Sequence, residues 1–413
     1  MIHIYRFLIN IILILSPIII IIRLFKKKED IKRFKEKFTF FSKKRKKGIL
    51  IWFHAASVGE LLSLVSLIQE LEKNKSISQI LITTTTLTSS KLFEKLKFKK
   101  TVHQFFPIDN NQLTKRFLDY WKPHIAIFID SEIWPNMIRN LETRSITKIL
   151  LNARISKKSF KRWILLGTFA KNLFKCFNYT FPQNTESKFY LKKLQVKKIK
   201  FIGNLKYAQN NFQKKNINLK LERFIKTKKI WCAASTHPGE ENICASVHFK
   251  LLKNIKNLVL IIIPRHVERV NKISRELSKF KLKQHIHSHT KKINPNTKIY
   301  IVDTYGETSL FFKFSKIVFM GKSLTIDGGQ NPLDAARENC TIVHGSKISN
   351  FLEIYNFLDK QKISFNTKNS NQLYKKVKFI FENNKKKLKI KDKINKIGNE
   401  ILYKNLKEIE SLL

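Results

Sequence analysis

Apolar residues in this chain form two patterns: short unbroken runs and longer segments with helical spacing. The run at 49–53 is apolar at every position, which is typical of a strand buried on both faces of a parallel sheet. Mostly small residues follow at 55–59, and apolar residues then recur at helical spacing from Leu61 to Ile68. Strand, short turn and helix in this order place ligand-binding groups at the carboxyl end of the strand, beside a helix N-terminus.

The same alternation continues along the chain and then restarts. Further strands are predicted at 79–83, 102–106, 125–129, 148–151, 179–181 and 199–202, with amphipathic helices between them, for example at 113–121 and 160–174. A polar stretch rich in Lys and Asn follows at 204–227. After it, strands are predicted at 230–233, 258–263, 299–302, 317–320 and 342–343, with helices that begin near Gly239, His266, Glu307 and Pro332. The pattern predicts two doubly wound α/β domains with parallel sheets and a cleft between them.

The N-terminus predicts a membrane anchor. Residues 7–22 are almost wholly apolar, and a dense run of Lys and Arg follows at 26–47. Positive charge after an apolar segment keeps that side in the cytoplasm, so we expect the rest of the chain to be cytoplasmic. A secretory signal peptide is the alternative, but the A-x-A cleavage pattern is missing. Because of Pro17, a shallow insertion in the membrane interface is an alternative to a helix that crosses the bilayer.

The charge of the chain indicates an anionic surface more than a nucleic acid. Lys and Arg number 81 against 30 acidic residues, a formal net charge of +51. Phe occurs 33 times and Gly 11 times, so the whole composition is skewed and much of the charge is surface Lys. RNA-binding aromatic motifs and zinc-finger spacings are missing, so we expect no nucleic-acid partner. The four cysteines are far apart, which favours a reduced compartment without disulfides.

The segment at 54–60, HAASVGE, resembles the N-terminal signature of the 3-deoxy-D-manno-octulosonic acid (Kdo) transferases of lipopolysaccharide synthesis. Other stretches are similar to the same family and occur in the same order: DSEIWPN (130–136), LNARIS (151–156), GNLK (203–206), AASTHPGEE (233–241), IIPRH (262–266), DTYGE (303–307) and GGQNPLDAA (328–336). The resemblance implies the GT-B fold of two Rossmann-like domains with an interdomain cleft. It also implies an inverting glycosyltransferase that moves Kdo from CMP-Kdo to the lipid A precursor, lipid IVA.

The resemblance and the patterns together give an expected domain organisation. The expected parts are a membrane anchor (1–25), a basic juxtamembrane segment (26–48), an acceptor-binding domain (49–205), a linker (206–228), a CMP-sugar-binding domain (229–395) and a C-terminal helix (396–413). The expected location is the bacterial inner membrane, with the catalytic domains on the cytoplasmic face. The anionic lipid surface and the lipid A precursor are the expected partners.

Three residues are implied to be catalytic: Glu60, Asp130 and Lys206. Glu60 would deprotonate the acceptor hydroxyl, although by position alone it also suits a helix-start carboxylate. Asp130 would assist at the transition state, but the family usually has Glu there. Glu132, two residues on, either belongs to this cleft or caps the following helix. Lys206 would balance charge on the phosphate or the sugar carboxylate. By composition alone, a surface lysine without a specific partner is the alternative interpretation.

The nucleotide site is implied to lie in the second domain. The expected binding residues are Pro264, Arg265, Tyr305, Gly306, Glu307, Asn331, Pro332, Leu333 and Asp334. An Arg fork suits phosphate or base, and free N–H groups at helix starts suit phosphate. A glycine turn followed by a helix cap is the plain alternative for 328–334. We find no DxD motif, so no cofactor and no metal are expected.

Two departures from the family pattern are Gln330, where the family has His, and Asp334, where it has Glu. Two other functions compete with the Kdo transferase interpretation. One is a GT-B enzyme that acts on UDP-sugars, which would require a different base and a diphosphate site. The other is a polybasic membrane scaffold without activity, which would not need Glu60, Arg265 and Asn331.

Overall fold

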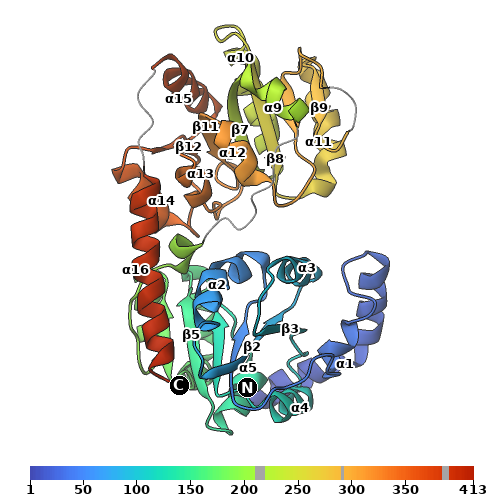
Figure 1. Cartoon of the computed structure of the whole chain (residues 1–413), viewed down its shortest axis with the longest axis vertical. Helices are drawn as coiled ribbons and strands as arrows, with labels where there is room; N and C mark the ends of the chain where they lie inside the picture. Colours follow the sequence, from blue (N-terminus) through green and yellow to red (C-terminus); the bar gives the residue numbers. More distant parts are fainter. Residues whose placement is uncertain (210–218, 290–292, 384–389) are drawn as a thin grey trace. The chain divides into compact units, whose positions relative to one another are not determined.

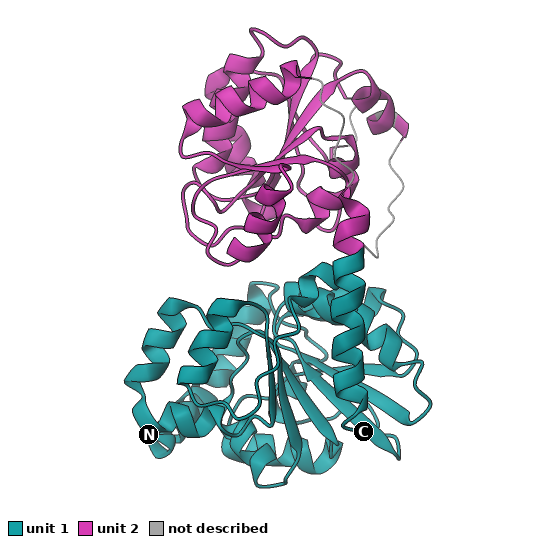
Figure 2. Cartoon of the chain, turned by 90° about the vertical axis from the view of Figure 1, so that its left-hand side faces the viewer, with its two compact units in different colours: residues 1–210, 396–413 teal, residues 211–395 magenta. Residues whose placement is uncertain are grey.

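The computed structural model of this chain describes residues 1–209, 219–289, 293–383 and 390–413. It divides into two compact units (Figure 2). Unit 1 comprises Met1–Asn210 and Lys396–Leu413, and unit 2 comprises Asn211–Asn395. Each unit contains one parallel sheet with helices around it (Figure 1).

The sheet of unit 1 has six strands in the order β3-β2-β1-β4-β5-β6, and every pair is parallel. The strands are β1 (Ile49–His54), β2 (Ile77–Thr84), β3 (Thr101–Phe105), β4 (Ile125–Ile129), β5 (Thr147–Ala153) and β6 (Tyr179–Pro182). Trp52 and Phe128 belong to one buried cluster, and their strand neighbours Phe53 and Ile129 belong to another. Since side chains alternate along a strand, both faces of the sheet are buried, as in doubly wound folds.

Most helices of unit 1 follow the carboxyl ends of its strands, whereas α1 precedes the first strand and α16 comes from the end of the chain. The helices are α1 (Ile2–Phe25), α2 (Val58–Leu71), α3 (Leu87–Lys95), α4 (Asn111–Trp121), α5 (Pro135–Glu142), α6 (Lys157–Leu165), α7 (Gly167–Phe174), α8 (Thr185–Lys193) and α16 (Lys391–Glu410), with the 3-10 turns η1 (Phe34–Phe38) and η2 (Leu205–Ala208). The C-terminal part of α16 belongs to this unit. Its Ile401 and Ile409 pack in the same cluster as Phe53.

The sheet of unit 2 has seven parallel strands in the order β13-β12-β11-β7-β8-β10-β9. The strands are β7 (Lys229–Thr236), β8 (Leu258–Pro264), β9 (Gln284–Ile286), β10 (Ile299–Ile301), β11 (Ile317–Met320), β12 (Thr341–His344) and β13 (Ser364–Asn366). The helices are α9 (Leu219–Lys226), α10 (Glu240–Leu251), α11 (Val270–Leu277), α12 (Thr308–Phe314), α13 (Leu333–Arg337), α14 (Leu352–Lys360) and α15 (Ser370–Glu382), with η3 (Val267–Arg269) and η4 (Ser278–Phe280). The core of this unit lies around Trp231, Leu260 and Phe319.

The predicted α/β fold with two doubly wound sheets is confirmed. Two predicted elements are wrong in detail. Residues 199–202 form no strand, because Ile199 makes only an isolated bridge to Thr180. The predicted helix at 160–174 is divided into α6 and α7, because the left-handed φ of +53° at Gly167, where α7 begins, turns the chain between them. Short β9 and β13 were not predicted, and part of the predicted linker lies outside the described residues.

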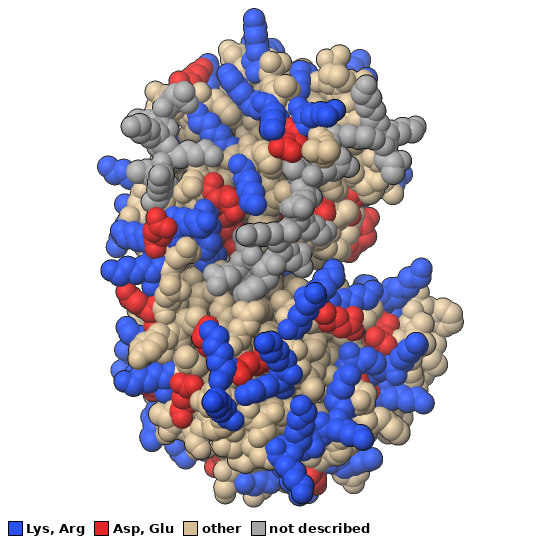
Figure 3. Space-filling view, in the orientation of Figure 1, with Lys and Arg blue, Asp and Glu red and all other residues tan. Residues whose placement is uncertain are grey.

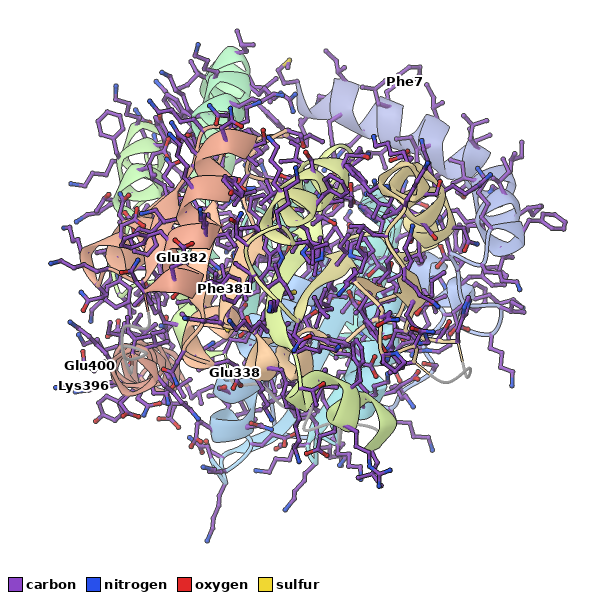
Figure 4. The ribbon with its side chains drawn as sticks, turned by 90° about the horizontal axis from the view of Figure 1, so that it is seen from above. Phe7, Glu338, Phe381, Glu382, Lys396 and Glu400 are labelled. Carbon is purple, nitrogen blue, oxygen red and sulfur yellow. The ribbon has the colours of Figure 1, made fainter. Side chains whose placement is uncertain are left out.

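Helix α1 is long and apolar enough to cross a membrane by length and composition. Its less exposed residues recur every three or four positions along its whole length: Ile2, Tyr5, Arg6, Ile9, Leu13, Ser16, Ile20, Arg23 and Leu24. The remaining positions are mostly exposed Ile, Leu and Phe, among them Phe7, which lies on the outer side of the helix in Figure 4. One face of α1 is therefore directed toward protein along its full length.

The basic segment after α1 is folded onto unit 1 around two buried acids. Glu29 pairs with Arg23 and Lys37 at 2.8 and 2.7 Å. Glu36, 2 % exposed, pairs with Arg33 and accepts a hydrogen bond from the backbone N–H of Phe105. The segment thus covers the free edge of β3, which would otherwise present unpaired backbone groups. Other Lys and Arg side chains are spread over the visible face of both units, mixed with acidic ones (Figure 3).

Candidate functional site

The strand order of unit 1 defines a switch point between β1 and β4. The chain leaves β1 toward β2 on one side and returns to β4 on the other, so the segments after these two neighbouring strands separate. Ligands of open α/β sheets bind at such a point, at the carboxyl edge. Here the segment after β1 leads to Glu60 in α2, and the segment after β4 is residues 130–134, hereafter the acid loop.

Glu60 is half-buried in the first turn of α2. Its Oε2 accepts a hydrogen bond from the backbone N–H of Ala56 at 2.8 Å, and its Oε1 accepts one from the hydroxyl of Ser57 at 2.8 Å. Ser57 in turn caps the helix by accepting from the backbone N–H of Glu60, in an arrangement like a capping box. The helix-start interpretation of this carboxylate is thus correct, and it fixes the side chain at the switch point.

The electrostatic surroundings of Glu60 are unusual for a capping residue. Burial raises the pKa of Glu60 to about 7, and the negative charges of Asp130 and Glu132 add to the rise, although the hydrogen bonds from Ser57 and Ala56 oppose it. A carboxylate with a pKa near neutrality is able both to accept a proton and to release it at physiological pH. The structure therefore brings together the acids that the sequence predicted at the ends of β1 and β4.

Asp130 is held at the end of β4 by residues from two other segments. It is 8 % exposed and has a φ of +52°, a left-handed conformation that Asp adopts more readily than most residues other than glycine. The side-chain amide of Asn152 donates to its Oδ1 at 2.6 Å, and the Lys206 ammonium lies 3.6 Å from its Oδ2. Lys206 is thus placed beside the acids, as the sequence predicted.

Asn152 is a site residue whose role the sequence did not reveal. It is the last residue but one of β5, has a φ of +52°, donates to Asp130, and accepts from the backbone N–H of Leu205 at 3.0 Å. One side chain therefore joins the acid loop to the turn that carries Lys206. Asn152 belongs to the stretch 151–156 that resembles the family, which was the one indication of a role, but the sequence did not indicate which residues it contacts.

Glu132 is tethered on the far side of the acid loop. Its Oε2 accepts from the indole N–H of Trp134 at 2.9 Å and lies 3.3 Å from Nε2 of the buried His54. The alternative that Glu132 caps the next helix is wrong, because α5 begins at Pro135 and its first free amides bind Asp109. Three carboxylates from two strand ends thus share one edge of the sheet.

Unit 2 has its own switch point, between β7 and β11. Glu240 lies there, fully buried at the start of α10. Its carboxylate accepts hydrogen bonds from four backbone N–H groups, those of His237, Lys322, Ser323 and Leu324, at 2.8 to 3.0 Å. This residue therefore holds the loop after β11 against the loop after β7.

The expected nucleotide residues lie at carboxyl ends of strands in unit 2. Pro264 is buried at the end of β8, and Arg265 after it is exposed. Tyr305 and Gly306 are exposed after β10, and the charge of Arg265 acts on the Tyr305 hydroxyl, so these two segments are close. Glu307 precedes α12, where it pairs with His287 at 3.0 Å and accepts from the Thr304 hydroxyl.

The second group of expected nucleotide residues surrounds the start of α13. The side chain of Asn331 accepts from the backbone N–H of Leu333 at 3.1 Å, and Pro332 occupies the N-cap position. Burial raises the pKa of Asp334, and an ion pair with Arg337 at 3.2 Å opposes this rise. The helix start has the chemistry expected for a polar ligand, and a direct role of these residues in nucleotide binding stays a prediction.

The fold defines the class of protein. Among solved structures, a UDP-N-acetylglucosamine 2-epimerase from Listeria monocytogenes, described as putative, matches with a TM-score of 0.63 at 12 % identity, covering 88 % of this chain and 96 % of that one. The UDP-GlcNAc 2-epimerase from Neisseria meningitidis matches with a TM-score of 0.60 at 12 % identity, over 88 % of this chain and 99 % of that one. At such identities the likeness shows the fold alone, which is the two-domain GT-B type.

Sequence comparison identifies the family. The profile described as 3-deoxy-D-manno-octulosonic-acid transferase (kdotransferase) matches residues 32–209. A 3-deoxy-D-manno-octulosonic acid transferase of Rickettsia bellii is 33 % identical over 94 % of this chain and 93 % of its own length. One of Haemophilus influenzae is 30 % identical over 88 % of this chain and 85 % of its own length. The chain belongs to the Kdo transferase family and is a glycosyltransferase.

Proposed function

We propose that this protein transfers a Kdo residue from CMP-Kdo to the lipid A precursor, lipid IVA, with inversion at the anomeric carbon. Its membership of the Kdo transferase family supports the transferred sugar. The observation that carries the mechanism is Glu60, whose carboxylate is fixed at the switch point with a pKa raised to about 7.

In this mechanism Glu60 accepts the proton of the acceptor hydroxyl as its oxygen attacks the anomeric carbon. The new C–O bond forms while the bond from that carbon to the phosphate oxygen breaks, and the electron pair leaves with CMP. One base is enough, because attack opposite to the leaving group inverts the carbon without an enzyme-bound intermediate. Asp130 assists at the transition state, and Lys206 balances charge on the donor phosphate or the sugar carboxylate.

The donor is assigned to unit 2, with Arg265 and the segments at 305–307 and 331–334 as its contacts. Backbone N–H groups at the starts of α12 and α13 and the Arg265 guanidinium suit a nucleoside monophosphate. We propose that the reaction needs no metal and no cofactor, since a single phosphate leaves and cationic side chains can balance its charge.

We propose that α1 anchors the protein on the cytoplasmic face of the bacterial inner membrane. One face of α1 follows unit 1 along its full length and the opposite face is apolar and exposed, which favours a helix lying in the interface over one crossing the bilayer. A crossing helix would carry the polar surface it contacts into the hydrocarbon region. Basic residues around 26–47 suit the anionic headgroups, and the lipid acceptor lies in the same surface.

The test is mass spectrometry of the lipid product after purified protein is supplied with CMP-Kdo and lipid IVA. A mass increase by one or more Kdo units supports the function, and the number of units is read directly. Transfer that persists in excess EDTA supports the metal-free mechanism. If the lipid mass were unchanged with CMP-Kdo and the protein instead transferred sugar from a UDP-sugar, the proposed Kdo transfer would be refuted.

The raised pKa of Glu60 predicts a pH profile. Because Glu60 acts in its ionised form, kcat/KM should level off above about pH 7 and fall by about tenfold per pH unit below it. After burial, Asp130 is the largest cause of the rise, so Asp130→Asn should move the acidic limb to lower pH even though it lowers the maximal rate. Asp119→Asn, on the surface of α4, is the matched control. An acidic limb that stays in place in Asp130→Asn would contradict this coupling.

A further inference from the structure

Helix α1 carries polar residues where a simple apolar anchor needs none. The Tyr5 hydroxyl donates to Oδ2 of Asp109 at 2.7 Å, and Arg6 donates to the side-chain oxygen of Asn136 at 3.0 Å. One turn further on, Asn10 accepts from the side chain of Asn110 at 2.8 Å. All these partners lie in two segments of unit 1, the loop after β3 and the first turn of α5. The polar face of α1 is therefore built to fit this part of the protein.

Asp109 is the centre of this contact, and it caps a helix that lacks a cap of its own. Trp134 stands at the N-cap of α5 without a side-chain cap, and Pro135 at the first position has no N–H. The next two amides, of Asn136 and Met137, donate to Asp109 at 3.0 and 2.8 Å. The Tyr5 hydroxyl is thus the third donor to a carboxylate that is 2 % exposed.

The charge of this buried carboxylate depends on its donors. Burial raises the pKa of Asp109 to about 6, and hydrogen bonds from Tyr5, Asn136 and Met137 oppose the rise. Removing one donor therefore makes Asp109 easier to protonate, and a protonated Asp109 is a weaker cap. The first turn of α5 then loses the partner of its free amides.

The acid loop lies directly before this helix and contacts the Asp109 loop a second time. The ring of Trp134 packs on Phe106, three residues before Asp109, with 5.2 Å between centroids. Phe106 also stacks on His54 at 3.9 Å, and Glu132 accepts a hydrogen bond from Trp134 and lies 3.3 Å from Nε2 of His54. A shift of Asp109 would therefore reach the acid loop from two sides.

We propose that Tyr5 and Asp109 form a lock through which the seating of α1 on unit 1 holds the acid loop in its working position. Tyr5 is then a positioning residue, and α1 is a part of the transferase site as well as an anchor. The consequence for turnover rests on the proposed function, whereas the consequence for the order of α5 does not. A chain without α1 is accordingly expected to be a poor catalyst even when its acceptor is presented in solution.

The first test is hydrogen exchange in detergent micelles, which needs no activity. Tyr5→Phe keeps the ring and removes the hydroxyl, so exchange at the amides of Asn136 and Met137 should become about tenfold faster, while β8 in unit 2 is unchanged. Tyr403→Phe, an exposed tyrosine of α16, is the matched control and should leave both segments unchanged. Wild-type exchange at these amides in Tyr5→Phe would overturn the lock.

The second test is turnover with lipid acceptor and CMP-Kdo in the same micelles. Tyr5→Phe should lower kcat by about tenfold without changing the KM for CMP-Kdo, since a small misplacement of catalytic groups acts on the rate. Binding to anionic vesicles should stay at the wild-type level, because the apolar face of α1 is intact. Faster exchange with an unchanged kcat would overturn the link to the acid loop. If Tyr5→Phe weakened vesicle binding and left kcat unchanged, Tyr5 would act in membrane anchoring and not in positioning the acid loop. A wild-type protein without turnover would refute the proposed function and leave the exchange test to decide the lock.

Discussion

Glu60→Gln is expected to lower kcat by about 10²- to 10⁴-fold, the usual contribution of a general base, while the protein stays folded and binds CMP normally. Glutamine keeps the length and shape of the side chain, and its carbonyl oxygen still accepts from the backbone N–H of Ala56. The start of α2 is therefore preserved, and only the ability to take up a proton is lost. The residual rate should also lose the acidic limb near pH 7.

The measurement compares initial rates of Kdo transfer with CMP affinity and thermal stability in the same preparation. Glu70→Gln, near the other end of α2 and paired with Lys73, is the matched control and should keep wild-type turnover. A Glu60→Gln protein with more than about a tenth of the wild-type kcat would remove Glu60 from the role of base, and attention would move to Asp130 or Glu132.

Much of the fold follows from residues close together in sequence. The strand predicted at 125–129 has the observed bounds of β4, because a short, wholly apolar run between polar residues is typical of a buried strand. The meeting of Glu60 and Asp130 was also predictable, since parallel strands end at one edge of a sheet. In contrast, the isolated bridge at Ile199 and the three-residue strands β9 and β13 depend on neighbours that a local pattern does not specify.

The residues that sequence reasoning missed all act through partners far away in the chain. Asn152 joins Asp130 to Leu205, and Asp109 joins Tyr5 to the start of α5. An Asn or Asp near the end of a strand is an ordinary turn residue by composition, and only its distant partners make it part of a site. The basic segment at 26–48 is a similar case. Its many Lys and Arg residues indicated a membrane contact, and the sequence did not indicate that it folds around two buried acids, Glu29 and Glu36.

One local pattern occurs twice in the chain and has two different outcomes. Ala55-Ala56-Ser57 follows β1 and precedes Gly59-Glu60, and Ala233-Ala234-Ser235, near the end of β7, precedes Gly239-Glu240 with two more residues between Ser and Gly. Glu60 faces the acids of the next strand end, whereas Glu240 faces four backbone N–H groups. Two similar stretches thus supply the proposed base in unit 1 and a structural clamp in unit 2, and the difference comes from the loop opposite.

Glu240→Gln is accordingly expected to destabilise unit 2 by about 3–5 kcal/mol, because the new amide nitrogen meets two backbone donors and leaves them unsatisfied in a buried site. For a domain of this size that corresponds to a fall in Tm of roughly 10 °C. The loop after β11 leads to Gly328 and Gly329, and the backbone N–H of Gly329 donates to the carbonyl of Lys322 at 2.7 Å. Loss of the clamp should therefore also weaken CMP binding by about tenfold or more.

Calorimetry and CMP titration of the full chain measure both effects. Glu382→Gln, an exposed residue near the end of α15, changes the same charge and should alter neither quantity. Glu60→Gln should keep the wild-type Tm and CMP affinity, so the two variants distinguish the two glutamates. Glu60→Gln should lose turnover with its structure intact, and Glu240→Gln should lose the hydrogen bonds that hold the loop after β11. If Glu240→Gln retained wild-type stability, the four hydrogen bonds to Glu240 would contribute little, and the loop after β11 would have to be held by its glycine contacts alone.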